Sequence, residues 1–283
     1  MTLRTNYHTH SRYCDGEGEI AEYLDAAIAA GLDSYGVSCH APVPVPTRDP
    51  WMMLPEDLPA YCAEVRTLRA AYHDRLPVFL ALEIDYAPGL DAFYREHILP
   101  HGFDYFVGSV HFVGEDGAGM PWEIDNSAER FASGLTGGFD GDVRGAFERY
   151  FALQRAMVGT PGVAIVGHMD KMKMWNRGDR YFRETDPWYV AAVEETLRAF
   201  KAGGLIVELN TSGLRKEIQS PFPSSWVLAR CRDLAIPVTV TADTHKPADV
   251  AAGFDDAADI LRDVGITHVM ARDGDRWVPR LVD

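Results

Sequence analysis

Two histidines and an aspartate near the start of the chain are residue types that bind metal ions. The segment YHTHSRYCDG (residues 7–16) places His8 and His10 two positions apart, and Asp15 follows five residues later. Side chains two apart on an extended strand point to the same side, so both imidazoles can reach one ion. Imidazole nitrogens and carboxylate oxygens are common ligands of divalent metals. This segment predicts a metal site, provided that other ligands fold next to it.

Further residues of these types follow short apolar segments elsewhere in the chain. They are His40, Glu83, His111, His168, Asp243 and His245. Glu83 directly follows the apolar run FLAL, where burying an unpaired carboxylate would cost several kcal/mol, so a metal ion is the simplest partner. Nine candidate ligands are too many for one ion, and the set contains no thiolate. Histidine with carboxylate therefore predicts two or three divalent ions, which we expect to be zinc, iron or manganese.

The apolar segments read as strands that are covered on both faces, because they are nearly continuous rather than alternating. We expect strands at residues 35–40, 78–84, 105–112, 163–168, 205–213 and 237–245. Amphipathic patterns between them predict helices at residues 18–32, 56–72, 142–158, 188–204, 224–236 and 247–265. This alternation predicts a parallel α/β architecture, either a closed barrel or an open sheet. In both, the carboxyl ends of the strands meet on one face, which would bring the candidate ligands together.

No Pro-, Ser- or Gly-rich linker interrupts the alternation, so we expect a single domain over residues 1–283. Residues 114–145 are the exception, because they are glycine-rich, acidic and aperiodic. We expect a loop insertion there, which serves either as a lid or as a plain insertion.

The composition limits the classes of partner. The chain carries 42 acidic and 27 basic residues, a formal net charge of −15. This charge would repel nucleic acid, so we expect no nucleic-acid partner. Without an apolar run long enough to span a bilayer and without a signal-peptide pattern, we expect a cytoplasmic protein that has no membrane partner. The sequence leaves the oligomeric state open.

Eight short segments, in chain order, resemble one known family. They are HTH, CDG, SCHAP, LEIDY, GSVHF, GHMDK, NTSGLR and TADTHKP. Together they are similar to the PHP (polymerase and histidinol phosphatase) superfamily, and most closely to its monofunctional histidinol-phosphate phosphatases, from about residue 6 to about residue 250. The resemblance implies the PHP fold, an irregular (β/α)7 TIM-like barrel with three metal ions.

The resemblance also implies how the ligands divide among the ions. One ion would be bound by His8, His10, Glu83 and Asp243. Glu83 would bridge to a second ion held by His111 and His168, and a third would be held by Asp15, His40 and His245. Many phosphatases of this group carry a histidine where this chain has Gly16, so Asp15 would take its place at the third ion.

Such a site suits hydrolysis of a phosphate ester, because the ions can activate water and offset the charge of the phosphoryl group. We expect Glu83, Asp243 and His245 to act in catalysis. His245, Asp170 or a water on the ions would protonate the leaving group. Arg215 is the first candidate for the phosphate because guanidinium can bind it in a bidentate manner. The other candidates are Lys173, Lys171 and Lys246.

The resemblance implies hydrolysis of L-histidinol phosphate to L-histidinol and phosphate in histidine biosynthesis. Asp85, Asn210 and the acidic loop 114–145 are candidate contacts for the cationic end of this substrate. The alternative enzyme is a PHP phosphoesterase that acts on nucleotides or another small phosphomonoester. A non-catalytic metal-binding protein would lack some ligands, and a metal-dependent amidohydrolase usually has a lysine where Glu83 stands.

Overall fold

Seven parallel strands form the centre of the molecule. The computed structural model describes residues 3–47 and 49–282. The strands stand in the order β1-β2-β3-β4-β7-β8-β9. Their bounds are Thr5–Asn6 (β1), Ser34–Val37 (β2), Val78–Asp85 (β3), Tyr105–Ser109 (β4), Val163–Val166 (β7), Ile206–Asn210 (β8) and Val238–Thr241 (β9). Six of these seven lie where the apolar segments predict them, and β1 precedes the His-x-His segment.

The first and last strands meet, so the sheet curves into a nearly closed barrel. Thr9 forms a parallel bridge with Thr244. The backbone N–H of His10 donates to the carbonyl of Thr244 at 2.8 Å. The sequence allows either a closed barrel or an open sheet, and the structure is the barrel. This is the TIM-like fold that the resemblance to the PHP superfamily implies.

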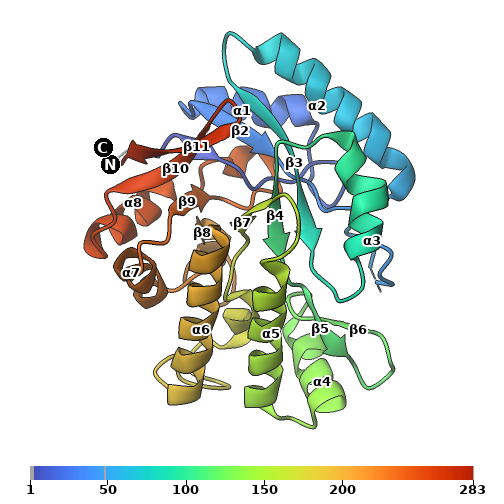
Figure 1. Cartoon of the computed structure of the whole chain (residues 1–283), viewed down its shortest axis with the longest axis vertical. Helices are drawn as coiled ribbons and strands as arrows, with labels where there is room; N and C mark the ends of the chain where they lie inside the picture. The colour runs from blue at the N-terminus through green and yellow to red at the C-terminus, as the bar shows by residue number, and fades with distance from the viewer. Residues whose placement is uncertain (1–2, 48, 283) are drawn as a thin grey trace.

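Helices surround the strands (Figure 1). The longer ones are Ile20–Ala29 (α1), Leu58–Tyr72 (α2), Val143–Met157 (α5), Pro187–Gly203 (α6), Ser225–Asp233 (α7) and Phe254–Asp263 (α8). The bounds fall within three residues of the ranges that the sequence predicts, except that the last helix begins later because a 3-10 turn, Pro247–Asp249, precedes it. A short helix, α3 (Asp91–Phe93), follows β3 and continues into a π-helical turn.

Aromatic side chains fill part of the interior of the barrel. Tyr7, Phe79 and Tyr105 pack there with small aliphatic residues. The Tyr105 hydroxyl donates to the carbonyl of Tyr7 at 2.7 Å. It can do so only because β2 has a glycine beside it: a Cβ on Gly36 would lie 1.8 Å from this hydroxyl.

The sequence predicts a loop insertion at residues 114–145, but the structure has regular elements there. A two-stranded hairpin is formed by β5 (Phe112–Glu115) and β6 (Pro121–Glu123), and helix α4 (Ala128–Phe139) follows it. The side chain of Ser127 caps this helix by accepting from the N–H of Arg130. Tertiary contacts explain the difference: Trp122 packs against Phe131 and Phe139, a pairing that no local periodicity reveals.

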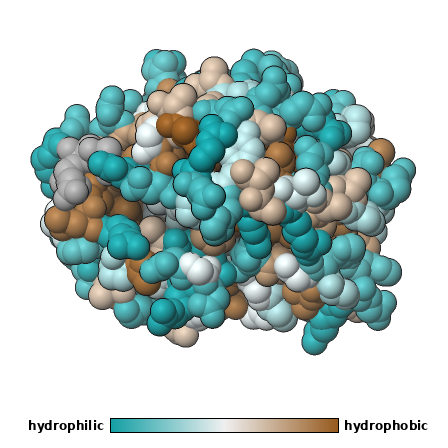
Figure 2. Space-filling view, turned by 90° about the horizontal axis from the view of Figure 1, so that it is seen from above, coloured by the Kyte–Doolittle hydropathy of each residue, from teal (hydrophilic) through white to brown (hydrophobic). Residues whose placement is uncertain are grey.

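A second hairpin, β10 (His268–Asp273) and β11 (Arg276–Leu281), lies at the amino-terminal end of the barrel. Figure 2 shows the upper face of Figure 1, which is mostly hydrophilic with small separate hydrophobic areas. No helix among the described residues is long and apolar enough to cross a bilayer.

Candidate metal centre and active-site cavity

The fold brings all nine predicted ligands to the carboxyl end of the barrel. Glu83 lies within β3, and the others lie in the turns that leave the remaining strands. Their side chains form four overlapping groups in which all ligand atoms lie within 4.8 Å of one another. The groups are His10–Asp15–His40–His245, His8–His10–Asp243, His8–Glu83–His168 and His40–Glu83–His111.

Glu83 is the centre of this cluster, and its two carboxylate oxygens face different histidines. Oε2 lies 3.1 Å from His8 Nε2 and 3.0 Å from His40 Nδ1. Oε1 lies 3.0 Å from His168 Nε2 and 3.8 Å from His111 Nε2. Burial by itself would raise the pKa of Glu83, but the charges of neighbouring histidines hold that pKa well below its usual range. The geometry is that of a carboxylate able to bridge two cations.

His40 differs from the grouping that the resemblance implies. Its Nδ1 faces Glu83, whereas its Nε2 lies 3.8 Å from Asp15 Oδ1. His245 Nε2 lies 3.3 Å from Asp15 Oδ2. His40 therefore lies between the Glu83 cluster and the Asp15 cluster instead of belonging to the second one alone.

The hydrogen bonds of the histidines test whether these residues fit a metal ion. His8 Nδ1 lies 2.9 Å from Glu208, His111 Nδ1 lies 2.5 Å from Asp85, and His245 Nδ1 lies 3.1 Å from the carbonyl of Asp243. Because these partners only accept, each Nδ1 carries a proton, and a cation bound at the site would replace any proton on Nε2 and take that lone pair. Within the described chain, buried Nε2 of His8, His10 and His111 and buried Oε2 of Glu83 have no hydrogen-bond partner. These nitrogen and oxygen atoms face one another at about 3 to 4 Å, and a metal ion bound between them would be their shared partner.

Two of the candidate ligands have a strained backbone. His168 has φ of 23° and Asp243 has φ of 48°, both in the left-handed region that side-chain-bearing residues seldom adopt. Such strain costs on the order of 1–3 kcal/mol and persists where the surrounding structure holds it. Here it turns two side chains inward at the ends of β7 and β9.

Glu208, which the sequence analysis does not assign, supports the cluster from inside the barrel. It is fully buried on β8. Besides His8, it accepts from the backbone N–H of His168 at 2.7 Å, from Asn210 at 2.7 Å and from Thr241 at 2.8 Å. Its signal in the sequence is the one that identifies Glu83, a carboxylate within an apolar run (LIVELN).

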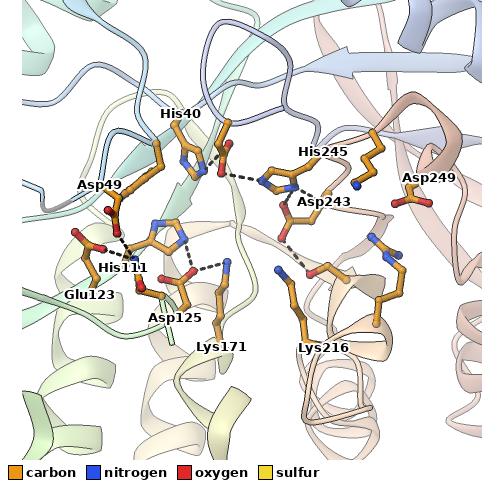
Figure 3. A pocket seen from close by; sticks show the side chains of 16 residues that line it. His40, Asp49, His111, Glu123, Asp125, Lys171, Lys216, Asp243, His245 and Asp249 are labelled. Atoms are coloured by element: carbon orange, nitrogen blue, oxygen red, sulfur yellow. Dashed lines mark hydrogen bonds and ion pairs between the residues drawn. The ribbon is translucent and has the colours of Figure 1, made fainter. Parts of the chain in front are cut away.

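A cavity of about 480 Å³ opens beside the cluster (Figure 3). Three of the four predicted phosphate contacts line it, namely Arg215, Lys171 and Lys246. The charge of Lys171 is offset by Asp125 at 2.9 Å, and that of Lys246 by Glu17 at 2.8 Å. The guanidinium of Arg215 donates to the carbonyls of Ala242 and Ala252 at 3.0 and 3.4 Å.

Lys173, the fourth predicted phosphate contact, does not line the cavity. Its ammonium group is fully buried and pairs with Asp170 at 2.8 Å. It also donates to the hydroxyl of Ser224. This arrangement joins the short helix η4 (Lys171–Trp175) to the start of α7, so we assign Lys173 a structural role. Asp170 is engaged in the same pair and is not placed to protonate a leaving group.

Asp85 and Asn210 do not line the cavity either, although the sequence analysis proposes them as substrate contacts. Both are fully buried. Asp85 accepts from His111, and Asn210 donates to Glu208 and to Asp243 Oδ2 at 3.2 Å. They orient candidate ligands from behind.

Eight other residues of the cavity wall were not predicted individually, although three of them belong to the predicted contact segment 114–145. They are Asp49, Trp51, Glu123, Asp125, Asn126, Ser212, Lys216 and Asp249. All lie in turns or at element ends, where the local pattern gives no indication of which face of the molecule they reach. Burial would raise the pKa of Asp125, but Lys171 and His111 hold it far below its usual range.

The chain is similar to known proteins over most of its length. Residues 6–212 match the model of the PHP domain. A protein of Deinococcus radiodurans named "Probable histidinol-phosphatase" is 30% identical over 266 residues, which cover 94% of this chain and 95% of that protein. The histidinol-phosphatase of Bacillus subtilis is 23% identical and is covered over 96% of its length. The crystal structure of Lactococcus lactis histidinol phosphate phosphatase, described as a complex with zinc, L-histidinol and phosphate, superposes with a TM-score of 0.76 at 20% identity, covering 98% of this chain and 100% of that one.

Proposed function

The chain belongs to the PHP domain family, and from this premise we propose that it hydrolyses L-histidinol phosphate to L-histidinol and inorganic phosphate, a reaction of histidine biosynthesis. The enzyme is a phosphoric monoester hydrolase. The observation that carries the proposal is Glu83, whose two oxygens face different histidines: Oε2 faces His8, His10 and His40, and Oε1 faces His111 and His168. The full-length match to the Deinococcus radiodurans relative supports the choice of substrate.

The nine ligand residues would bind two or three divalent ions, with Glu83 shared between two of them. The donor set of imidazole and carboxylate favours zinc, iron or manganese. When bound, such ions activate a water molecule and offset charge on the phosphoryl oxygens. Of the ligands that line the cavity, Asp15 and His245 are the most exposed, so their part of the cluster is the most open to a substrate.

The phosphate of the substrate would lie between this cluster and the basic residues on the same side of the cavity. Arg215 and Lys216 line it, and within residues 3–47 and 49–282 neither has a carboxylate partner. Their charge is therefore free for a dianionic group, whereas the charge of Lys171 is shared with Asp125. Figure 3 shows the side chain of Lys216 pointing into the cavity. With Asp170 enclosed and both ring nitrogens of His245 engaged, a water molecule would protonate the leaving alkoxide.

The decisive experiment is phosphate release from L-histidinol phosphate, compared with nucleoside monophosphates and p-nitrophenyl phosphate. The metals in the same enzyme preparation are counted by elemental analysis. We expect a kcat/KM for L-histidinol phosphate at least about a hundredfold above the others, because a substrate-specific site binds remote groups as well as the reacting one. Equal or better turnover of nucleotides would overturn the substrate while keeping the metal-dependent chemistry.

A further inference from the structure

Acidic and basic residues are unevenly distributed over the cavity wall. In Figure 3, Asp49, Glu123 and Asp125 lie on one side, where Lys171 pairs with Asp125, and Lys216 lies on the other side together with Asp249. Arg215 and Lys246 also line the wall. The candidate metal ligands His40, Asp243 and His245 line the cavity too. A phosphate bound at the ions and basic residues would leave the rest of the substrate to extend toward the carboxylates.

An aromatic ring borders the acidic side of the cavity. Trp51 is partly buried, and its ring packs edge-on against His40 at a centroid distance of 4.5 Å and against His111 at 5.5 Å. It stacks at 26° on Phe112, the first residue of β5, with centroids 5.8 Å apart. Trp51 therefore stands next to the metal cluster and only two residues from Asp49.

The carboxylates on this side are held in place by the segment that the sequence predicts as a loop. Asp49 forms an ion pair with Arg130 of α4 at 2.5 Å, which offsets part of its charge, and accepts from Asn126 at 3.2 Å. Asn126 also donates to Glu123 Oε2 at 3.3 Å. Glu123 is the last residue of β6 and is 7% exposed. Hairpin β5–β6 and helix α4 thus supply and brace the acidic side.

From this arrangement we propose that Trp51, with Asp49 beside it, determines specificity by binding the cationic amino-imidazole end of the substrate. This assignment rests on the proposed function. An aromatic face beside carboxylates binds organic cations, since cation–π attraction and ion pairing add to one another. L-Histidinol phosphate carries an ammonium and an imidazole at one end and a phosphate at the other. The candidate ligands, with Arg215 and Lys216, would hold its phosphate, and its cationic end would then extend toward Trp51 and Asp49.

The test compares two substrates in the same enzyme: L-histidinol phosphate, and glycerol 1-phosphate, which has no ring and no cation. For Trp51→Leu we expect the ratio of the two kcat/KM values to fall about tenfold, because the cation–π contact is lost while the phosphate contacts stay. Trp51→Phe keeps an aromatic face, so its ratio stays within about threefold of the wild type. Asp49→Asn lowers the ratio about threefold at low salt and less at high salt, because an exposed charge is screened. Asp74→Asn, an exposed aspartate in an ion pair with His73, is the charge-matched control.

A second measurement uses the products as inhibitors of glycerol 1-phosphate hydrolysis. In Trp51→Leu the inhibition constant of L-histidinol rises about tenfold relative to that of inorganic phosphate. If both substrates lose activity equally and both inhibition constants change together, Trp51 merely packs the metal cluster, and the assignment is wrong. If the wild-type enzyme had the same kcat/KM for glycerol 1-phosphate as for L-histidinol phosphate, the proposed function itself would be wrong. Metal content measured in each variant separates loss of ions from loss of binding.

Discussion

At the scale of single residues, the site depends on hydrogen bonds that fix the tautomer of each histidine. His8, His111 and His245 each place an acceptor at Nδ1. The acceptors of His8 and His111 are carboxylates with no access to solvent, so a bound cation would offset their charge as well as that of Glu83. The residues behind the ligands therefore contribute to metal affinity although they do not reach the cavity.

Glu208→Gln should lower metal affinity about ten- to a hundredfold. All four partners of Glu208 donate, so the NH₂ group of glutamine would face a donor and displace the His8 ring. The measurement is metal retained per chain after dialysis against graded chelator, with Glu195→Gln on α6 as the exposed control. Wild-type retention in Glu208→Gln would show that His8 is oriented without this carboxylate.

Arg215→Ala should raise the KM for L-histidinol phosphate about tenfold and change kcat much less, because it removes binding that substrate and transition state share. Steady-state kinetics check this, and Arg198→Ala, exposed on α6, removes the same charge outside the cavity. An unchanged KM would exclude Arg215 from the phosphate site. A fall in bound metal would instead assign it to holding the backbone at Ala242.

At the scale of elements, the inserted hairpin and helix pack closely through glycines of α4, at Gly134, Gly137 and Gly138. Within α4, Gly134 lies against Trp122 of β6, and a Cβ at this position would lie 2.0 Å from Trp122 Cδ1. The chain leaves β6 at Glu123 and continues to Asp125 and Asn126, all of which line the cavity. The seating of α4 on β6 thus decides where the acidic side of the cavity stands.

Gly134→Ala should lower the free energy of unfolding by about 1–3 kcal/mol, because the methyl group forces the indole aside. We also expect a lower kcat/KM for L-histidinol phosphate as the acidic side shifts. Urea unfolding and steady-state kinetics measure the two effects. Gly159→Ala is the matched control, since its nearest neighbour to an added Cβ is 4.0 Å away. Equal stability of the two variants would mean that α4 adjusts without cost.

At the scale of the whole molecule, the candidate metal centre joins parts of the chain that are far apart. His8 and Glu208 are 200 residues apart in sequence, and the ligands follow β1, β2, β4, β7 and β9 in addition to Glu83 on β3. The contact that joins the first and last strands, between Thr9 and Thr244, lies among these ligands. Bound ions would therefore stabilise the closure of the barrel as well as take part in catalysis.

Removal of metal should lower the melting temperature by roughly 5–10 °C, because ions bound to the folded chain alone stabilise it by mass action. In their absence the buried carboxylates and imidazoles of the cluster lose their shared partner. Thermal unfolding with and without a chelator tests this, and adding zinc or manganese back should restore the original value. An equal melting temperature in both states would mean that the cluster is stable without ions.

The amino-acid sequence by itself determined the alternation of strands and helices and the residue types at the strand ends. Both are local properties: burial on two faces gives continuous apolar runs, and a polar residue at the end of such a run is recognisable without knowing its neighbours. The types of His8, Glu83 and Asp243 also sufficed to indicate a metal site.

Only the tertiary structure decided which of these residues meet, because closure of the barrel sets the distances between strand ends. It placed His40 between two clusters, enclosed Lys173 with Asp170, and put Glu208 behind His8. It also brought Trp51 to the rim of the cavity, from a turn whose sequence carries no periodic signal. The sequence does not show whether a charged side chain faces substrate or a buried partner. The energy of burial distinguishes the two cases, and it depends on the whole fold.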